Sequence, residues 1–308
     1  MPLYLDIVAP VYNESEGITH FVGTVHKEVL GKIPRSRLIL VDDGSTDDSW
    51  NRMLEASKNY PNLCLLKLSR NVGHQKALLA GLRFSDAERV AIIDSDLQDN
   101  PKLIIDMLKI LESGYEIVYG KRLAREGENL FKKVSAKFFY RFFKWISHED
   151  IPLDTGDFRV VTRLAVDEVL KIRESTPFFR GNFASIGLKS AEFPYNRSER
   201  YAGHTKYSLS KMIALASTAV FSFSDFPLKI ALRVSITGLG IALLSAGYVL
   251  LNYAINQSIS GWASLFIFIV FFGSLNVLLL SLVGYYVLEI WRVSRNSRVY
   301  TLTKIVES

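Results

Sequence analysis

Short apolar runs alternate with longer segments of mixed polarity through the first 122 residues of the chain. Strands are predicted at the apolar runs, which fall at 3–9, 37–41, 64–68, 89–93 and 116–119. Helices are predicted from Glu14 to about Leu30, over 73–84 and from Pro101 onward. Because the strands are continuously apolar, we expect a mainly parallel sheet covered on both faces, which is an α/β fold of the Rossmann-like kind.

The second half of the chain contains a much longer apolar stretch. Residues 234–288 include no Asp, Glu, Lys, Arg or His. This length is too great for one membrane crossing of ~20 residues and fits two, which we expect at about 234–255 and 262–288. The chain is thus predicted to hold a globular domain (1–228), a two-helix transmembrane domain (229–291) and a basic cytoplasmic tail (292–308).

Basic residues flank the two predicted spans and indicate their orientation. Lys229 and Arg233 precede the first span, and Arg292, Arg295 and Arg298 follow the second. By the positive-inside rule, both termini and the globular domain lie in the cytoplasm. No signal peptide is expected, because polar residues interrupt any apolar leader.

The segment 131–147 has the pattern of a basic amphipathic helix. One face would carry large aromatic side chains and the other basic side chains. This pattern is typical of a helix in the headgroup layer of a membrane, although a helix that buries its aromatics in a soluble core would share it. The largely apolar segment 208–226 is expected to approach the same surface. The net charge of +6 is explained better by an anionic bilayer than by nucleic acid, which we do not expect as a partner.

Small residues and the single cysteine give two further expectations. Gly238, Gly240, Ala242 and Gly247 in the first span permit close helix contact, and so we expect a homo-oligomer. Cys64 is the one cysteine, which excludes an internal disulfide, and its apolar surroundings predict an inert buried thiol.

Three carboxylates stand within six residues, at 94–99, directly after the apolar run 90–93. An Asp-x-Asp turn after a buried strand is suited to a hard divalent cation, which takes one or two carboxylates and shares its other positions with substrate phosphates. An acidic β-turn without a ligand is the alternative. Asp99 is expected to belong to the turn and to the helix after it rather than to the metal.

Two further polar clusters, 13–14 and 42–43, also follow predicted strands. Ligands bind at the carboxyl ends of strands in parallel sheets, so three acidic clusters at one edge predict a functional rim. The chain has neither Gly-x-Gly-x-x-Gly nor Gly-Lys-Ser/Thr, and a dinucleotide oxidoreductase or a P-loop ATPase is therefore not indicated. The loop 200–207 carries two cations and a hydroxyl suited to phosphate oxygens, although a solvated basic loop would look the same.

Taken in order, these motifs resemble glycosyltransferase family 2, which has the GT-A fold. Within this family, they resemble the polyprenyl-phosphate glycosyltransferases, which include dolichol-phosphate mannose synthases. The resemblance is closer still to bactoprenol glucosyltransferases. The resemblance covers essentially the whole chain and rests on the segments 10–14, 41–47, 94–101, 120–122, 154–159 and 200–207. The sequence Asp-Thr-Gly-Asp-Phe-Arg at 154–159 points to the glucosyl branch. Thr205 stands where the family often has Ser, a change that keeps the hydroxyl.

The resemblance implies roles for residues on the donor side. Those that would hold the nucleotide sugar are Pro10, Tyr12, Glu14 and Asp43 (base and ribose), Asp94 (sugar), and Arg200, Lys206 and Tyr207 (diphosphate). Asp96 and Gln98 would ligate Mg²⁺ or Mn²⁺.

The resemblance also implies an acceptor site and a reaction. Arg122 and Ser135, with Lys132 nearby, stand where the family handles the lipid phosphate, and Asp157 stands where it usually has a catalytic base. The implied reaction is inverting transfer of glucose from UDP-glucose, or alternatively of mannose from GDP-mannose, to a polyprenyl phosphate at a bacterial-type inner membrane. Because the second pKa of a phosphate monoester is ~6, the acceptor has no proton to lose at neutral pH. We therefore expect Asp157 to orient cations or sugar hydroxyls, or to stabilise positive charge at the anomeric carbon.

Three other classes of protein fit the sequence less well. A processive polysaccharide synthase of this family would need a Gln-x-x-Arg-Trp motif and more spans, and the motif is absent. A non-catalytic nucleotide-sugar binding protein would not need the full set of polar residues at the rim. A flippase or channel would need ionisable groups within its spans.

Overall fold

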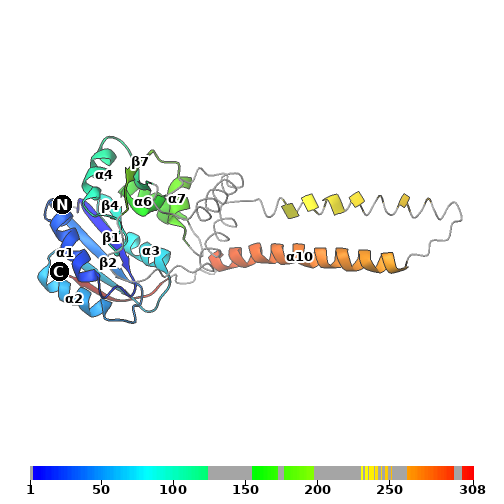
Figure 1. The fold of residues 1–308 in the computed structure, drawn as a ribbon, viewed down its shortest axis with the longest axis horizontal. Coiled ribbons are helices and arrows are strands. Elements are labelled where there is room, and N and C mark those ends of the chain that lie inside the picture. Colours follow the sequence, from blue (N-terminus) through cyan, green and yellow to red (C-terminus); the bar gives the residue numbers. More distant parts are fainter. Residues whose placement is uncertain are drawn as a thin grey trace. The chain divides into compact units, whose positions relative to one another are not determined.

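The computed structural model describes residues 3–123, 155–172, 177–197, 262–294 and 300–308, together with isolated helical residues between 230 and 251. The chain divides into two units. One holds the N-terminal region and the last residues, and the other holds Ala216–Ser297. Each unit is described below by itself (Figure 1).

An eight-stranded sheet forms the centre of the first unit. Its strands are β1 (Leu5–Val11), β2 (Ser36–Asp42), β3 (Leu63–Leu68), β4 (Arg89–Ile92), β5 (Ile117–Arg122), β6 (Thr155–Thr162), β7 (Ser190–Tyr195) and β8 (Leu302–Glu307), in the order β7-β5-β6-β4-β1-β2-β3-β8. The four strands β4-β1-β2-β3 are mutually parallel, as their apolar runs predict. Their carboxyl ends therefore meet at one edge of the sheet.

The strand β6 makes this part of the sheet mixed rather than wholly parallel. β6 lies between β4 and β5 and is antiparallel to both, with Ile92 opposite Arg159. β7 then pairs parallel with β5. The antiparallel β6 runs towards the opposite edge, so its first residues, which include Asp157, stand at the edge where the parallel strands end.

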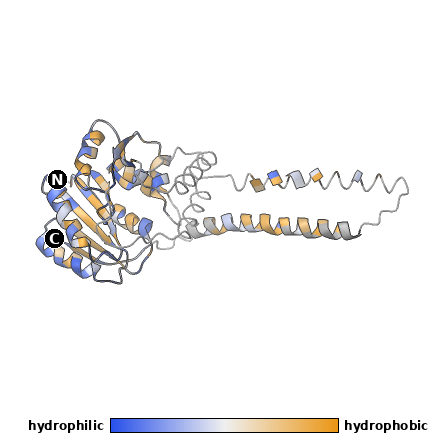
Figure 2. Ribbon diagram, viewed as in Figure 1, coloured by the Kyte–Doolittle hydropathy of each residue, from blue (hydrophilic) through white to orange (hydrophobic). Residues whose placement is uncertain are grey.

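Helices cover both faces of the sheet, as predicted. One face packs against α1 (Ile18–Val25), α2 (Ser49–Asn59) and α4 (Leu103–Glu112), and the other against α3 (His74–Phe84), α6 (Arg163–Lys171) and α7 (Phe179–Ser185). Figure 2 shows apolar residues along the strands between these layers. Cys64 lies in the second core, where burial raises the pKa of its thiol to about 12, consistent with an inert thiol.

The first helix begins later than the sequence suggests. α1 starts at Ile18 and continues into a π-helix, η1 (His26–Leu30), so the predicted end near Leu30 is confirmed. Glu14 was expected in the first helical turn but precedes the helix by four residues. It lies in the loop after β1 because its backbone N–H donates to Ser49 Oγ (2.8 Å) in the neighbouring loop.

The last residues complete the sheet. We expected a tail over 292–308, whereas Leu302–Glu307 forms β8, antiparallel to β3. Burial differs along β8: Leu302 and Val306 are partly buried, and Val306 packs against the core, while Thr303 and Lys304 are exposed. The tail assignment missed this strand because its partner β3 lies more than two hundred residues away in the sequence.

The second unit contains α10 (Trp262–Ser294), a 33-residue helix. Among the described residues, it is the one helix long and apolar enough to cross a membrane, through the window Phe271–Leu288 with a mean hydropathy of 1.8 and none of that window buried. Apolar residues follow its length in Figure 2. The first predicted span (234–255) lies largely outside the described residues, and the predicted amphipathic segments (131–147 and 208–226) lie wholly outside them.

Candidate functional site

The loops that follow the parallel strands are hydrogen-bonded to one another at the rim of the sheet. Tyr12, directly after β1, is partly buried in the same loop as Glu14, whose N–H donates to Ser49 beyond β2. Ser95 Oγ, beyond β4, donates to the carbonyl oxygen of Pro10 (2.9 Å). The structure thus brings the three predicted polar clusters together.

Asp43 supports the loop between β3 and α3. Its two carboxylate oxygens accept hydrogen bonds from the N–H groups of Val72 (2.7 Å) and Gly73 (3.0 Å). Burial raises the pKa of Asp43, against the effect of these N–H donors. Gly44 beside it has φ +65, and a Cβ there would lie 2.4 Å from the carbonyl carbon of Arg70. Glycine therefore allows the two loops to touch, which fixes the start of α3.

The turn after β4 holds the predicted metal ligands. The N–H of Gln98 donates to Asp96 Oδ1 (3.1 Å). Leu97 between them has φ +57, a left-handed conformation that bulky residues rarely adopt. Such a conformation costs on the order of 1–3 kcal/mol and persists only where the surrounding contacts maintain it.

One guanidinium contacts three carboxylates of this turn. Arg197 Nη2 lies 3.5 Å from Asp94 Oδ2 and 3.9 Å from Asp96 Oδ2. Its Nε donates to Asp99 Oδ1 at 3.1 Å. Arg197 follows β7 by two residues, so this strand delivers the cation to the turn.

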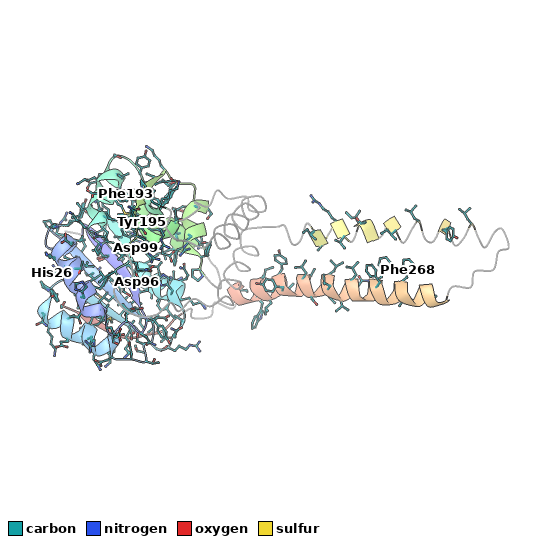
Figure 3. All side chains as sticks on the ribbon, in the orientation of Figure 1. His26, Asp96, Asp99, Phe193, Tyr195 and Phe268 are labelled. Carbon is teal, nitrogen blue, oxygen red and sulfur yellow. The ribbon has the colours of Figure 1, made fainter. Side chains whose placement is uncertain are left out.

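Asp99 is an anchor beneath the turn and has no exposed surface. It accepts a hydrogen bond from the hydroxyl of Tyr195, and its Oδ2 lies 3.9 Å from Arg122 Nη2. Figure 3 labels Asp96, Asp99 and Tyr195 in the sheet unit. Asp99 thus ties the turn to Tyr195 at the end of β7 and to the neighbouring Arg122.

Arg122, predicted to handle the lipid phosphate, packs against the first residues of β6. A Cβ at Gly156 would lie 2.3 Å from Arg122 Nη2. Glycine at this position therefore lets the guanidinium approach the β6 backbone directly. Gly156 directly precedes Asp157 in the sequence, so Arg122 packs against the backbone next to Asp157.

Asp157 is surrounded by hydrogen-bond donors and cations. Its Oδ1 accepts from Arg180 Nε (3.1 Å). Its Oδ2 accepts from Gln75 Nε2 (3.0 Å) and lies 3.2 Å from His74 Nε2. The buried Arg159 places Nη2 3.9 Å from Oδ1, and the Asp157 side chain is 5% exposed. Both carboxylate oxygens are therefore engaged by the protein itself.

These neighbours fix the charges of the pair formed by Asp157 and His74. Burial alone would raise the pKa of Asp157, but Arg180 and His74 hold it well below its usual range. Burial would lower the pKa of His74, but Asp157 and Asp94 together raise it to about 9. At neutral pH the site therefore holds a carboxylate next to an imidazolium.

Asp94 is perturbed in the opposite direction. Its Oδ1 lies 3.6 Å from His74 Nε2. Burial raises the pKa of Asp94, and repulsion from Asp157 and Asp96 adds to the rise, while His74 opposes it. Asp94 lies between His74 on one side and Arg197 on the other.

Gln75 and Arg159 fix Asp157 relative to α7. Gln75 Oε1 accepts the N–H of Phe179 (3.1 Å) while its amide nitrogen donates to Asp157. Arg159 donates to the carbonyl oxygens of Gly156, Asp157 and Phe179 at 3.1–3.2 Å. Since α7 carries Arg180, these clamps also set the position of that cation.

The predicted site residues divide into two groups. The described ones, which the structure places at or beside the rim, are Pro10, Tyr12, Glu14, Asp43, Asp94, Asp96, Gln98, Arg122 and Asp157. Those outside the described residues are Lys132, Ser135, Arg200, Lys206 and Tyr207.

Four further residues at the site are not predicted from the sequence: His74, Gln75, Arg180 and Arg197. His74 and Gln75 follow β3 in the polar segment 69–76, which is the same signal that identified the other three clusters. Arg180 and Arg197 carry no such signal, because they follow strands and loops that the apolar pattern did not predict.

The turn at 94–99 suits a divalent cation in the chemistry of its donors. Asp94 and Asp96 supply carboxylate oxygens, and a guanidinium nitrogen already lies between them. A hard divalent ion prefers such oxygens and needs only one or two protein carboxylates when a substrate phosphate completes its shell. Among the residues that the structure describes, no three His, Cys, Asp or Glu side chains are grouped to hold a metal.

The fold and the sequence have clear relatives. Glucosyl-3-phosphoglycerate synthase from Mycobacterium tuberculosis, solved with Mn²⁺, UDP-glucose and phosphoglyceric acid, matches with a TM-score of 0.50 and 16% identity over 71% of this chain and 77% of that chain. The sheet, its helices and the rim therefore define a glycosyltransferase of the GT-A fold. The model of the family "Glycosyl transferase family 2" matches residues 6–170, and the chain belongs to that family.

Relatives extend the match to almost the whole chain. The "Uncharacterized glycosyltransferase YkcC" of Bacillus subtilis is 38% identical over 300 residues, which are 97% of this chain and 93% of YkcC. The "Prophage bactoprenol glucosyl transferase homolog" of Escherichia coli is 28% identical over 302 residues, or 98% and 99% of the two chains.

Proposed function

We propose that the protein transfers glucose from UDP-glucose to the phosphate of a membrane polyprenyl phosphate and inverts the anomeric centre. The observation that carries the proposal is the near full-length similarity to a relative named for bactoprenol glucosyl transfer, including the apolar C-terminal region. The contacts to both carboxylate oxygens of Asp157 also support the proposal, because the reaction described next needs no proton acceptor.

The acceptor in this proposal needs no base. A phosphate monoester with a second pKa of ~6 is a dianion at neutral pH. One of its oxygens forms the bond to the anomeric carbon while the bond from that carbon to the diphosphate oxygen breaks. The electron pair of the broken bond leaves with UDP, and no proton is transferred. Asp157 suits this step because it organises His74 and Arg180 rather than accepting a proton.

The donor is assigned to the rim of the parallel strands. Pro10, Tyr12, Glu14 and Asp43 form the side where we place the base and ribose, and Asp94 is assigned to the sugar. Asp96 and Gln98 would hold Mg²⁺ or Mn²⁺, which neutralises the leaving diphosphate when bound.

Arg200, Lys206 and Tyr207 are assigned to the diphosphate. Arg197 contacts Asp94 and Asp96, and Arg200 follows it by three residues.

The acceptor and the apolar regions complete the proposal. Arg122, Lys132 and Ser135 are assigned to the lipid phosphate. The segments 234–255 and 262–288 are proposed to span the inner membrane, with the sheet unit in the cytoplasm and the segments 131–147 and 208–226 against the bilayer. We also propose a homo-oligomer formed through the small residues of the first span.

The test uses the purified full-length protein with polyprenyl phosphate in detergent. Radiolabelled UDP-glucose, GDP-mannose and UDP-N-acetylglucosamine are supplied separately with Mg²⁺ or Mn²⁺, and label is counted in the extracted lipid. We expect label from UDP-glucose and none when polyprenol replaces polyprenyl phosphate. Label from GDP-mannose alone would overturn the sugar assignment, and no label from any donor would overturn the transfer.

A further inference from the structure

Two basic side chains beside Asp157 are partly exposed, although the carboxylate that they contact is buried. The side chains of His74 and Arg180 are 38% and 31% exposed, whereas that of Asp157 is 5% exposed. His74 Nε2, which is itself buried, lies 3.2 Å from Asp157 Oδ2, and Arg180 Nε donates to Asp157 Oδ1 at 3.1 Å. The buried carboxylate thus holds two partly exposed basic side chains at the rim.

Basic side chains gather around Asp157. Arg180 and Arg159 both contact Asp157, whereas His74 contacts Asp157 and also lies 3.6 Å from Asp94. Arg159 is buried, and its guanidinium donates to three backbone carbonyls. The partly exposed basic side chains of this cluster are therefore His74 and Arg180, and Arg122, which lies 3.9 Å from Asp99, packs against Gly156 next to Asp157. Such a cluster is complementary to a multiply charged anion.

The position of Asp94 indicates which phosphate the cluster serves. Asp94, assigned to the sugar, contacts Arg197 of the metal turn through Oδ2 (3.5 Å) and His74 through its other oxygen, Oδ1 (3.6 Å). A single displacement requires the leaving group and the attacking oxygen to be on opposite sides of the anomeric carbon. The diphosphate belongs with the metal turn, so the side of His74 is left for the attacking phosphate.

We propose that His74 and Arg180, together with Arg122, bind the phosphate monoester of the acceptor, and that Asp157 is the residue that positions them. This inference rests on the proposed transfer to a polyprenyl phosphate. An oxygen of the bound dianion attacks the anomeric carbon as described above, and the cations orient the phosphate without accepting a proton from it.

The experiment compares His74→Gln, Arg180→Gln and Arg180→Lys with the wild type in the full-length protein. Arg52→Gln is the matched control, because Arg52 is an exposed arginine in α2 that pairs with Asp48 away from the rim. Binding of polyprenyl phosphate, of polyprenol and of UDP is measured separately without a donor sugar, and KM is measured for each substrate.

We expect each Gln variant to weaken binding of polyprenyl phosphate about tenfold or more, since a hydrogen bond to a charged group contributes roughly 1.5–3 kcal/mol. UDP binding is expected to stay within about twofold of the wild type, and Arg180→Lys to recover part of the loss because it keeps the charge. Arg52→Gln is expected to change none of these values.

Weakened UDP binding with unchanged acceptor binding would assign the cations to the donor and overturn the inference. Unchanged binding of both substrates would reduce the cluster to a structural role and also overturn it. If the wild type binds polyprenyl phosphate no better than polyprenol, the protein has no site for the acceptor phosphate, and the inference is overturned. Wild-type protein that binds polyprenyl phosphate through these residues but transfers no sugar would overturn the proposed function while the binding site stands. If Arg180→Gln does not fold, Arg180→Lys and His74→Gln decide the same question.

Discussion

Asp157 and the carboxylates of the turn at 94–99 stand at one edge of the sheet and have opposite electrostatic surroundings. Asp157 has a cation or a donor at both oxygens, and its pKa is held well below the usual range. Asp94, Asp96 and Asp99 share the guanidinium of Arg197. Although His74 also lies 3.6 Å from Asp94, burial and repulsion from nearby carboxylates raise the pKa of Asp94.

The difference shows that nearby carboxylates have different tasks. A carboxylate with an excess of cations holds those cations in place and is a poor proton acceptor. Closely spaced carboxylates that repel one another, as the raised pKa of Asp94 indicates, attract a further cation. We therefore expect metal binding at the turn and positioning of cations at Asp157, and the following variants test that division.

The largest effect is expected for Asp96→Asn. Loss of a carboxylate at the turn removes a metal ligand, and we expect activity to fall by about 10³-fold or more, in line with the several kcal/mol that a metal contributes to charge stabilisation. Mn²⁺ binding, followed by electron paramagnetic resonance, is expected to weaken in parallel. Asp106→Asn in α4, which pairs with the neighbouring Lys109, is the control. Full activity in Asp96→Asn without added metal would contradict the assignment.

Asp157→Asn comes next. We expect kcat to fall about 10²-fold, as for loss of a positioned electrostatic group, while the shape of the pH–rate profile is kept. Removal of one partner from a buried charge cluster typically costs roughly 3–5 kcal/mol, so the free energy of unfolding is expected to fall as well. A general base predicts instead that the variant loses a titration seen in the wild type, and that result would sink the positioning role.

Arg197→Met tests whether the guanidinium of Arg197 competes with a metal ion for the carboxylates of the turn. If the guanidinium and the metal compete for Asp94 and Asp96, its removal is expected to tighten Mn²⁺ binding by about tenfold, which corresponds to about 1.4 kcal/mol. Tyr195→Phe is the control, because it removes a hydrogen bond to Asp99 and leaves Arg197 in the chain. Weaker Mn²⁺ binding in Arg197→Met would show that the guanidinium supports the metal site rather than competing with it.

The smallest effect concerns the pH dependence of stability. The pKa of His74 is raised in the folded protein from 6.5 to about 9. Its contribution is therefore fully present below about pH 6.5 and is lost as the pH rises through about 9. Because the side chain is more than a third exposed, solvent reduces the effect. In thermal unfolding, we expect the higher stability of the wild type relative to His74→Gln to disappear as the pH rises from about 6.5 to about 9. Parallel curves for the two proteins would contradict the charge assigned to His74.

The sequence predicts the parallel half of the sheet and much of the rim for one physical reason. Strands β1 to β5 are short apolar runs, and the polar residues that end three of them mark the edge directly. β6 is not predicted from the apolar pattern, because the charged residues Asp157 and Arg159 lie within the strand. Their burial depends on partners that are distant in sequence. His74 could have been found from the polar segment after β3, whereas Arg180 and Arg197 become visible only once α7 and β7 are placed.

The position of β8 has a consequence for the order in which the protein is made. β3 is synthesised early, but the strand that covers its edge is separated from it by residues 69–301, which include α10. At roughly 5–20 residues per second, the edge of β3 waits on the order of ten to fifty seconds on the ribosome for its partner. An uncovered edge strand is a template for wrong pairing with other chains. The edge of β3 is therefore open to wrong pairing during synthesis until β8 has been made.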